Sequence, residues 1–186
     1  MFRGRVAKEL ADLQGGGVPG VLVRGEPAFH GETFALEVQL QGPRESPYED
    51  GAFLVRVQCG ASYPLRPPSV HFLTPVYHPN IAQGTGAVCL DLLKPPPAGT
   101  WSPARCGLRV LLLSLQQLLA TPNVHDPLEA DIAAQLQSNP AAFRQAAQAH
   151  CAKHAAQLCS AAAPAAAEAQ AAEATAPSVG SGRARG

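Results

Sequence analysis

The sequence predicts an α+β fold, in which an N-terminal helix precedes a four-stranded antiparallel meander and further helices follow it. Four short apolar or alternating runs, separated by glycine and proline turns, lie between residues 20 and 73. Leucines at helical spacing begin at Leu108. With 186 residues, 46% of them hydrophobic, the chain is long enough for one well-filled core with residues left over.

The first element is expected to be an amphipathic helix. Val6, Leu10 and Leu13 recur at helical spacing with charged residues between them, and the glycines at 15–17 end the pattern. The four runs that follow, predicted as strands, are residues 20–23, 34–40, 52–57 and 69–73. Their even spacing favours a meander over parallel strands with helical crossovers.

The second half of the chain is expected to be mainly helical. Residues 63–68 contain three prolines, which favour extended backbone and exclude a helix. The leucines from Leu108 to Leu119 follow the i, i+3, i+4, i+7 pattern of a core helix, which should end near residues 121–123. Shorter helical patterns occupy about 129–137 and 140–157.

We divide the chain into a core, residues 1–157, and a tail, residues 158–186. The tail is rich in alanine, glycine and serine and has almost nothing large and apolar to bury. Such a segment cannot offset its ordering entropy by packing on a core. We therefore expect the tail to be disordered and assign it no function.

Composition narrows the classes of partner. The formal net charge is zero, with 14 basic and 14 acidic residues, so no global basic field draws the protein to nucleic acid. No apolar run has the length of a membrane span. The five cysteines form an odd set without a Cys-x-x-Cys pair, which argues against a disulfide framework and a zinc ribbon. The expected partners are proteins, and no metal site is expected.

One cysteine has chemically informative neighbours. Cys89 follows the turn His78-Pro79-Asn80-Ile81 by a short loop and precedes an apolar run, and Trp101-Ser102-Pro103 comes after that run. A rigid turn carrying a side-chain amide, next to an apolar run, suits a thiol presented for acyl transfer. These residues resemble the active-site signature of the ubiquitin-conjugating enzymes.

The resemblance covers most of the chain. Separate motifs in the family's order occupy residues 5–10, 42–43, 46–49, 63–68, 126–128 and 139–141. Within the family, residues 72–80, 94–99 and 126–132 are most similar to the type T branch, which belongs to the Fanconi anaemia pathway. The resemblance implies the ubiquitin-conjugating fold, with a cis bond between Tyr63 and Pro64.

The resemblance also implies roles around Cys89. Cys89 would be the nucleophile that carries ubiquitin as a thioester. Asn80 would donate to the oxyanion or support the loop, and Asp126 would position or deprotonate the attacking lysine. Two features depart from the family pattern. His125 stands where many relatives have a second acid, and the loop between Asn80 and Cys89 is one residue longer than usual.

Further residues match the family's partner surfaces. The positions that contact a RING-type ubiquitin ligase are Arg5, Lys8, Leu65, Ser102, Pro103 and Ala104. Those that contact donor ubiquitin are Arg109, Leu112 and Gln116, although periodicity also allows Leu112 to belong to the core. Lys94 lies five positions after Cys89, close enough to capture ubiquitin itself.

The function that follows is that of a ubiquitin-conjugating enzyme. Its expected partners are ubiquitin, the ubiquitin-activating enzyme, a RING-type ligase of the Fanconi kind and a protein substrate; no nucleic acid or membrane is expected. It needs no cofactor, because ATP is used by the upstream activating enzyme. Monoubiquitination in DNA crosslink repair implies a nuclear location, with a cytoplasmic pool left open. Two alternatives stand beside it: an inactive ubiquitin-conjugating-like binding module, and conjugation of a ubiquitin-like modifier.

Overall fold

A computed structural model describes residues 2–156, so the tail predicted for 158–186 lies outside the described residues. The helices and strands follow in the order α1 (Phe2–Gln14), β1 (Val21–His30), β2 (Thr33–Gln41), β3 (Ala52–Cys59), β4 (Ser69–Phe72), η1 (Asp91–Leu93), α2 (Leu108–Ala120), α3 (Ala130–Ser138) and α4 (Pro140–His154). The four strands form one antiparallel sheet in sequence order. The predicted order of helix, meander and helices is confirmed.

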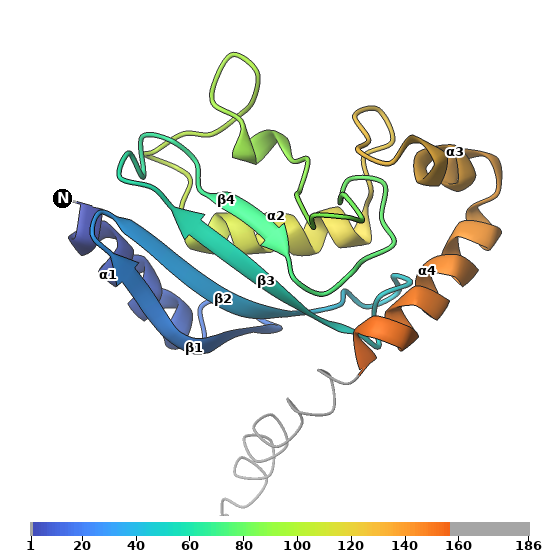
Figure 1. Cartoon of the computed structure of the whole chain (residues 1–186), viewed down its shortest axis with the longest axis horizontal. Helices are drawn as coiled ribbons and strands as arrows, with labels where there is room; N and C mark the ends of the chain where they lie inside the picture. The colour runs from blue at the N-terminus through green and yellow to red at the C-terminus, as the bar shows by residue number, and fades with distance from the viewer. Residues whose placement is uncertain (1, 157–186) are drawn as a thin grey trace, which may run out of the picture.

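The core lies between the sheet and two helices. In Figure 1, α1 and α2 lie behind the strands, while α3 and α4 extend beyond one end of the sheet. Along β2 and β3, apolar side chains at alternate residues are buried, as at Leu36, Val38 and Val55. Leu111 and Leu115 of α2 are fully buried. Burial of each such side chain stabilises the fold by about 1.5–3 kcal/mol.

The first strand is longer than the sequence predicts. The apolar run at 20–23 marks only its beginning, and Pro27 lies inside the strand. Proline is tolerated because β1 is an edge strand and the pairing with β2 is irregular between Arg24 and Ala28. A strand that tolerates proline at an edge is hard to recognise from pattern alone.

The proline-rich segment after β3 is fastened to the connection that precedes α2. The Tyr63–Pro64 bond is cis, as the resemblance implied. The indole Nε1 of Trp101 donates to the backbone oxygen of Pro64 at 2.7 Å, and the rings of Tyr63 and Trp101 lie 6.0 Å apart. The loop that carries Leu65 is therefore held against the segment that carries Ser102.

A buried carboxylate joins three parts of the chain. Glu9 of α1 accepts hydrogen bonds from the Arg5 side chain and the Tyr63 hydroxyl. It also accepts the backbone N–H of Leu108 at 3.0 Å. That N–H belongs to the first turn of α2, where backbone donors have no partner within the helix and a negative charge is favourable. Glu9 thus fixes the start of α2 against α1 and the loop around Tyr63.

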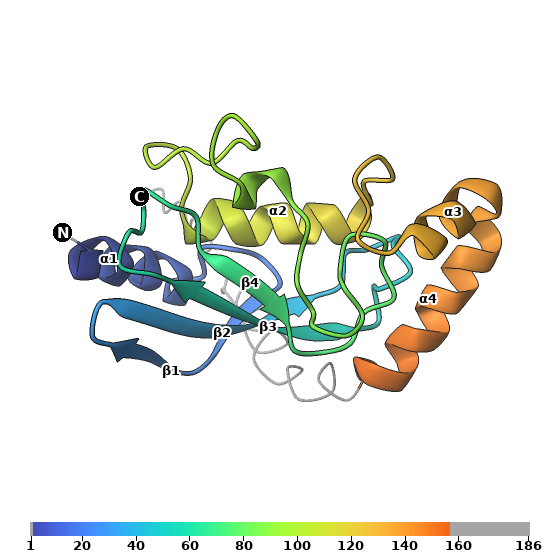
Figure 2. The ribbon, with the colours of Figure 1, turned by 45° about the horizontal axis from the view of Figure 1, so that its top comes forward.

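Within residues 2–156, no helix combines the length and the apolar character that crossing a bilayer requires. The longest irregular connection runs from β4 to α2, and η1 is its one helical turn among the described residues. In Figure 2 this connection runs past one end of α2 and then continues above that helix. It contains the His78 turn, Cys89 and Trp101, and so positions the candidate site.

Candidate active site

The turn before Cys89 is held by a buried histidine. The Nδ1 atom of His78 accepts the backbone N–H of Asn80 at 3.0 Å, and Nε2 donates to the backbone oxygen of Leu118 at 3.0 Å. The Pro79 oxygen accepts the N–H groups of Leu128 and Glu129. His78 therefore links the turn to α2 and has no ring nitrogen left to act as a base.

Burial lowers the pKa of His78 from 6.5 to about 4, although the bond to Leu118 opposes the shift. The unfolded chain therefore binds a proton that the folded protein excludes. The stabilising contribution is complete above pH 6.5 and is lost as the pH falls towards 4. We expect this group to remove about 3 kcal/mol from the free energy of unfolding across that window.

The measurement is urea denaturation between pH 7 and pH 4.5. The matched variant is His78→Gln, which keeps polar atoms in the turn but does not titrate. Its free energy of unfolding should be lower at pH 7 and should depend less on pH. An equal pH dependence in both proteins would contradict the buried neutral state of His78.

Backbone hydrogen bonds close the loop between Asn80 and Cys89. Cys89 donates its backbone N–H to Asn80 O at 2.9 Å, Ile81 pairs with Val88, and Ala82 N donates to Ala87 O. The residues beyond this short ladder form a turn, in which Gly86 has φ +69°. A Cβ atom at Gly86 would lie 1.9 Å from Phe72 O, so the turn requires glycine.

The side-chain amide of Asn80 is directed at the loop that carries Asp126. Its Nδ2 donates to the backbone oxygens of Asn123 and Asp126 at 2.7 and 3.1 Å. Its Oδ1 accepts the N–H of Asn123 at 2.9 Å. Both amide hydrogens therefore have partners, and Asn80 itself is fully buried. This geometry favours loop support, the second of the two roles that the sequence left open.

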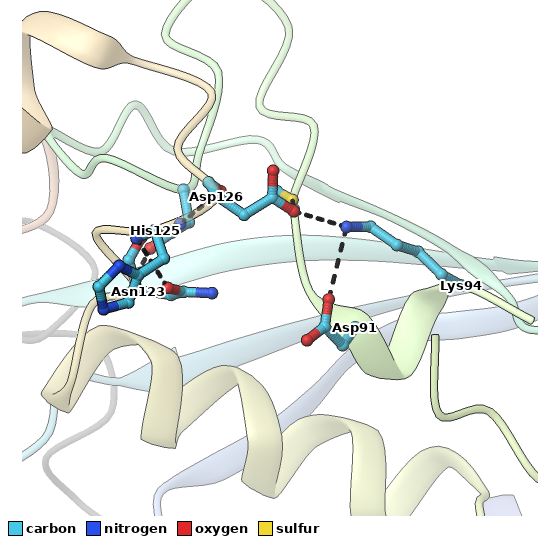
Figure 3. Close-up of polar contacts among 7 residues, drawn as sticks. Asp91, Lys94, Asn123, His125 and Asp126 are labelled. Carbon is cyan, nitrogen blue, oxygen red and sulfur yellow. Dashed lines mark hydrogen bonds and ion pairs between the residues drawn. The ribbon is translucent and has the colours of Figure 1, made fainter. Parts of the chain in front are cut away.

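The loop places the Asp126 carboxylate beside the Cys89 sulfur. The Sγ of Cys89 donates to Oδ2 of Asp126 at 3.1 Å, and the Nζ of Lys94 donates to the same oxygen at 2.7 Å. A second, longer contact of 3.4 Å joins Lys94 to Asp91 in η1. Figure 3 shows Asp126 directed towards Lys94, with His125 and Asn123 on the other side of Asp126.

The two charged neighbours of Cys89 have opposite effects on the pKa of its thiol. Burial raises the pKa of the Cys89 thiol, the hydrogen bond to Asp126 raises it further, and Lys94 lowers it. Lys94 also lowers the pKa of the Asp126 carboxyl, mainly through their hydrogen bond, so this group is ionised at neutral pH. The resting side chain is thus a thiol that donates to a carboxylate, and it must lose its proton to attack.

Substitution of the two charged neighbours should move the reactivity of Cys89 in opposite directions. Asp126→Asn removes a group that raises the pKa of Cys89, so its alkylation by iodoacetamide should begin at lower pH. Lys94→Gln removes a group that lowers this pKa, so alkylation should begin at higher pH. Mass spectrometry of the Cys89 peptide between pH 6 and 10 measures both profiles. Shifts in the same direction for the two variants would contradict this arrangement.

Cys89 differs from the other described cysteines. It is half-buried, whereas Cys59, Cys106 and Cys151 are buried, and none of the four forms a disulfide. Burial raises the pKa of Cys59 to about 12, so this thiol stays protonated. No group of three or more His, Cys, Asp or Glu side chains that could hold a metal ion occurs within residues 2–156.

The residues predicted to contact a ligase are only partly exposed. Leu65 is 75% exposed, while Ser102 and Pro103 are half-buried and Ala104 is exposed. Lys8 is exposed. Arg5 is half-buried, because its guanidinium binds Glu9 and donates to the backbone oxygen of Cys106 at 3.0 Å.

The predicted contact of Leu112 with donor ubiquitin is wrong. Leu112 has no exposed surface, because its side chain belongs to the core face of α2, as the alternative interpretation of the leucine pattern allowed. Arg109 is exposed, and Gln116 is half-buried, with its side chain donating to Pro19 O at 3.0 Å. The large apolar side chains that α2 does expose are Val110 and Leu113.

Two functional features were not recognised from the sequence. The ion pair between Lys94 and Asp126 joins residues 32 positions apart, and no local pattern reveals it. The hydrogen bonds of Glu9 to Tyr63 and Leu108 also join distant parts of the chain, and the charged residues around Glu9 in α1 give no sign of its burial. The spacing of five residues placed Lys94 near Cys89, but nothing in the sequence indicated that Asp126 would be its partner.

Comparison with known proteins identifies the family of the chain. A family model described as ubiquitin-conjugating enzyme matches residues 5–151. Ubiquitin-conjugating enzyme E2 T of Bos taurus is 45% identical over 122 residues, covering 66% of this chain and 62% of that protein. Ubiquitin-conjugating enzyme E2 13 of Saccharomyces cerevisiae is 44% identical over 130 residues, covering 69% of this chain and 78% of that protein.

A solved structure shares the fold. The E2 domain of a ubiquitin conjugating enzyme from Toxoplasma gondii superposes with a TM-score of 0.69 at 36% identity, covering 82% of this chain and 98% of that one. The chain spans between 52% and 64% of the length of the E2 T relatives that it matches. With a family model matched over most of its length, the chain belongs to the ubiquitin-conjugating enzyme family.

Proposed function

We propose that this chain accepts ubiquitin from the ubiquitin-activating enzyme as a thioester on Cys89 and passes it to lysine. The observation that carries the proposal is the environment of Cys89. It is the one half-buried thiol among the four described cysteines, and it lies 3.1 Å from the carboxylate of Asp126, whose backbone oxygen accepts a hydrogen bond from Asn80. Family membership supports the same conclusion.

The chemistry consists of two acyl transfers. In the first, the Cys89 thiolate attacks the carbonyl carbon of ubiquitin's C-terminal glycine, and the thiol of the activating enzyme leaves. In the second, a neutral lysine amine attacks the new thioester and the Cys89 thiolate leaves. Asp126 lies where it can attract the incoming ammonium and accept its proton. Enzymes of this family need no bound cofactor.

The finer proposal follows the type T relatives. Similarity to the E2 T enzymes supports monoubiquitination in DNA crosslink repair, a RING-type ligase of the Fanconi kind and a nuclear location. On this proposal the ligase contacts Lys8, Leu65 and Ala104, with Arg5, Ser102 and Pro103 at the edge of the contact. Donor ubiquitin contacts Arg109 and Gln116.

The first experiment is a charging assay with activating enzyme, ATP and the full chain. A thiol-sensitive adduct with ubiquitin supports the proposal. An adduct formed only with a ubiquitin-like modifier favours that alternative, and no adduct with any modifier favours the inactive binding module. For the pathway, restoration of crosslinker survival in cells lacking E2 T by this chain, with no restoration by Cys89→Ala, supports the type T function.

We also propose that Lys94 is a slow acceptor in self-modification when no substrate amine is present, through the small fraction of its side chain that is neutral, because its nitrogen and the Cys89 thiol contact the same carboxylate oxygen. Lys94→Arg should remove the ubiquitin-modified form that builds up when the purified enzyme is charged without substrate. Lys153→Arg, a change on the exposed side of α4, is the matched control. Unchanged automodification in Lys94→Arg would contradict the assignment.

A further inference from the structure

The carboxylate nearest the reactive thiol is already occupied. The Lys94 ammonium lies 2.7 Å from the Asp126 oxygen that also accepts the Cys89 thiol. Lys94 follows the end of η1 directly, so a short rigid turn fixes the base of its side chain. The Lys94 ammonium and the Asp126 carboxylate reach each other from two separate segments of the chain (Figure 3).

This occupancy affects the amine that must attack the thioester. A substrate lysine arrives mainly as an ammonium at neutral pH. It must reach within a few ångströms of the carbonyl on Cys89, and the anion that contacts the sulfur is Asp126. An approaching ammonium therefore meets a carboxylate whose charge is already neutralised by Lys94.

We propose that Lys94 is a specificity-determining residue that holds the Asp126 carboxylate and competes with acceptor lysines for it. This inference rests on the proposed ubiquitin-conjugating function. An acceptor that cannot displace Lys94 is disfavoured, whereas a lysine delivered at high local concentration by a bound ligase and substrate displaces it. The consequence is low transfer to free amines and dependence on a positioned substrate.

The surroundings provide a second position for the displaced ammonium. The Asp91 carboxylate lies 3.4 Å from Lys94 Nζ. The Lys94 side chain is 35% exposed, so it can move towards Asp91 without crossing packed side chains. Displacement therefore exchanges one carboxylate for another and leaves Lys94 protonated, so that the substrate amine rather than Lys94 takes the place beside Asp126.

The kinetic test measures discharge of ubiquitin from Cys89 to free L-lysine, without ligase, at increasing lysine concentration. Lys94→Gln should lower the apparent KM for lysine about two- to fivefold, the range expected for loss of an exposed ion pair, with kcat nearly unchanged. Lys94→Arg should keep the higher KM, because it retains the cation. Lys153→Gln removes an exposed lysine of α4 and should match the wild type.

The competition acts through Asp126, so a double mutant provides a further test. In an Asp126→Asn background, Lys94→Gln should have no effect on KM, because the shared carboxylate is gone. An undiminished effect in that background would overturn the proposal. An unchanged KM for the single variant Lys94→Gln, which retains Asp126, would also overturn the proposal.

A second readout does not depend on ubiquitin. The chain has three lysines, Lys8, Lys94 and Lys153. Competitive acetylation with trace acetic anhydride at pH 9 should label Lys94 more slowly than Lys8 or Lys153, and Asp126→Asn should remove this protection. Fast labelling of Lys94 in the wild type would overturn the proposal. A chain that protects Lys94 yet never charges with ubiquitin would instead refute the proposed function.

Discussion

Replacement of Cys89 by alanine should abolish the ubiquitin adduct completely. Transfer from the activating enzyme requires a nucleophile that becomes acylated, and no hydroxyl or thiol replaces Cys89 in the alanine variant. Among the described cysteines the remaining three are buried, and the thiol of Cys59 has a pKa raised by burial. We therefore expect no thiol-sensitive adduct above background on non-reducing gels.

Cys89→Ser refines this prediction. Its hydroxyl can accept ubiquitin as an oxygen ester, so a slowly formed adduct should resist reducing agents and be cleaved by mild alkali. Cys59→Ala, a change within β3 on the buried face of the sheet, is the matched control and should charge like the wild type. A thiol-sensitive adduct that persists in Cys89→Ala would place the nucleophile elsewhere.

Asn80→Ala should have the second largest effect, on both stability and transfer. The substitution leaves the N–H and oxygen of Asn123 and the oxygen of Asp126 without their partner. Loss of a buried hydrogen-bonding group costs about 1–3 kcal/mol of unfolding free energy. The Asp126 loop loses its anchor, so discharge to lysine should fall about 10- to 100-fold, as expected for a misplaced catalytic group.

The two steps of the reaction should respond differently to Asn80→Ala. Cys89 keeps its backbone bond to the oxygen of residue 80, so charging should fall less than discharge. Amide hydrogen exchange reports the cause: protection of Asn123 should be lost, whereas Leu128 and Glu129, bonded to Pro79 O, should keep theirs. Loss of discharge with Asn123 still protected would contradict the loop-support role.

Asn80→Asp separates shape from hydrogen bonding. The carboxylate is nearly isosteric and can still accept the N–H of Asn123, but its second oxygen would face the two backbone oxygens that Nδ2 now serves. We therefore expect Asn80→Asp to impair discharge at least as strongly as Asn80→Ala. Discharge at the wild-type rate would show that the donor contacts to the loop are dispensable.

Periodicity predicted the large elements because their burial repeats with the backbone. The alternation in β2 and β3 and the leucines of α2 each mark one buried face, and the structure confirms both. The end of β1 was missed because pairing at an edge tolerates Pro27. The assignment of Leu112 to the ubiquitin-contacting surface was wrong because it relied on a matching family position. The leucine pattern around Leu112 is the better guide to whether its side chain faces the core.

The site was predicted where its residues share a local motif. Cys89 and Asn80 belong to one signature, and a backbone hydrogen bond joins them although the loop between them contains eight residues. Lys94 and Asp126 meet only after the connection before α2 and the loop after it have folded together. A contact between distant segments leaves no periodic trace, so the occupied carboxylate could not be inferred from the sequence.

The carboxylate of Glu9 has a consequence for mapping the proposed ligase surface. Arg5, Tyr63 and the first N–H of α2 all meet at this one group, so α1, the Leu65 loop and the start of α2 form one mechanical unit. A substitution at Arg5 will therefore also loosen the Leu65 loop and the start of α2, which are distant from Arg5 in the sequence. The losses of affinity from single substitutions across these three segments should therefore not be additive, and double-mutant cycles between them should report the coupling.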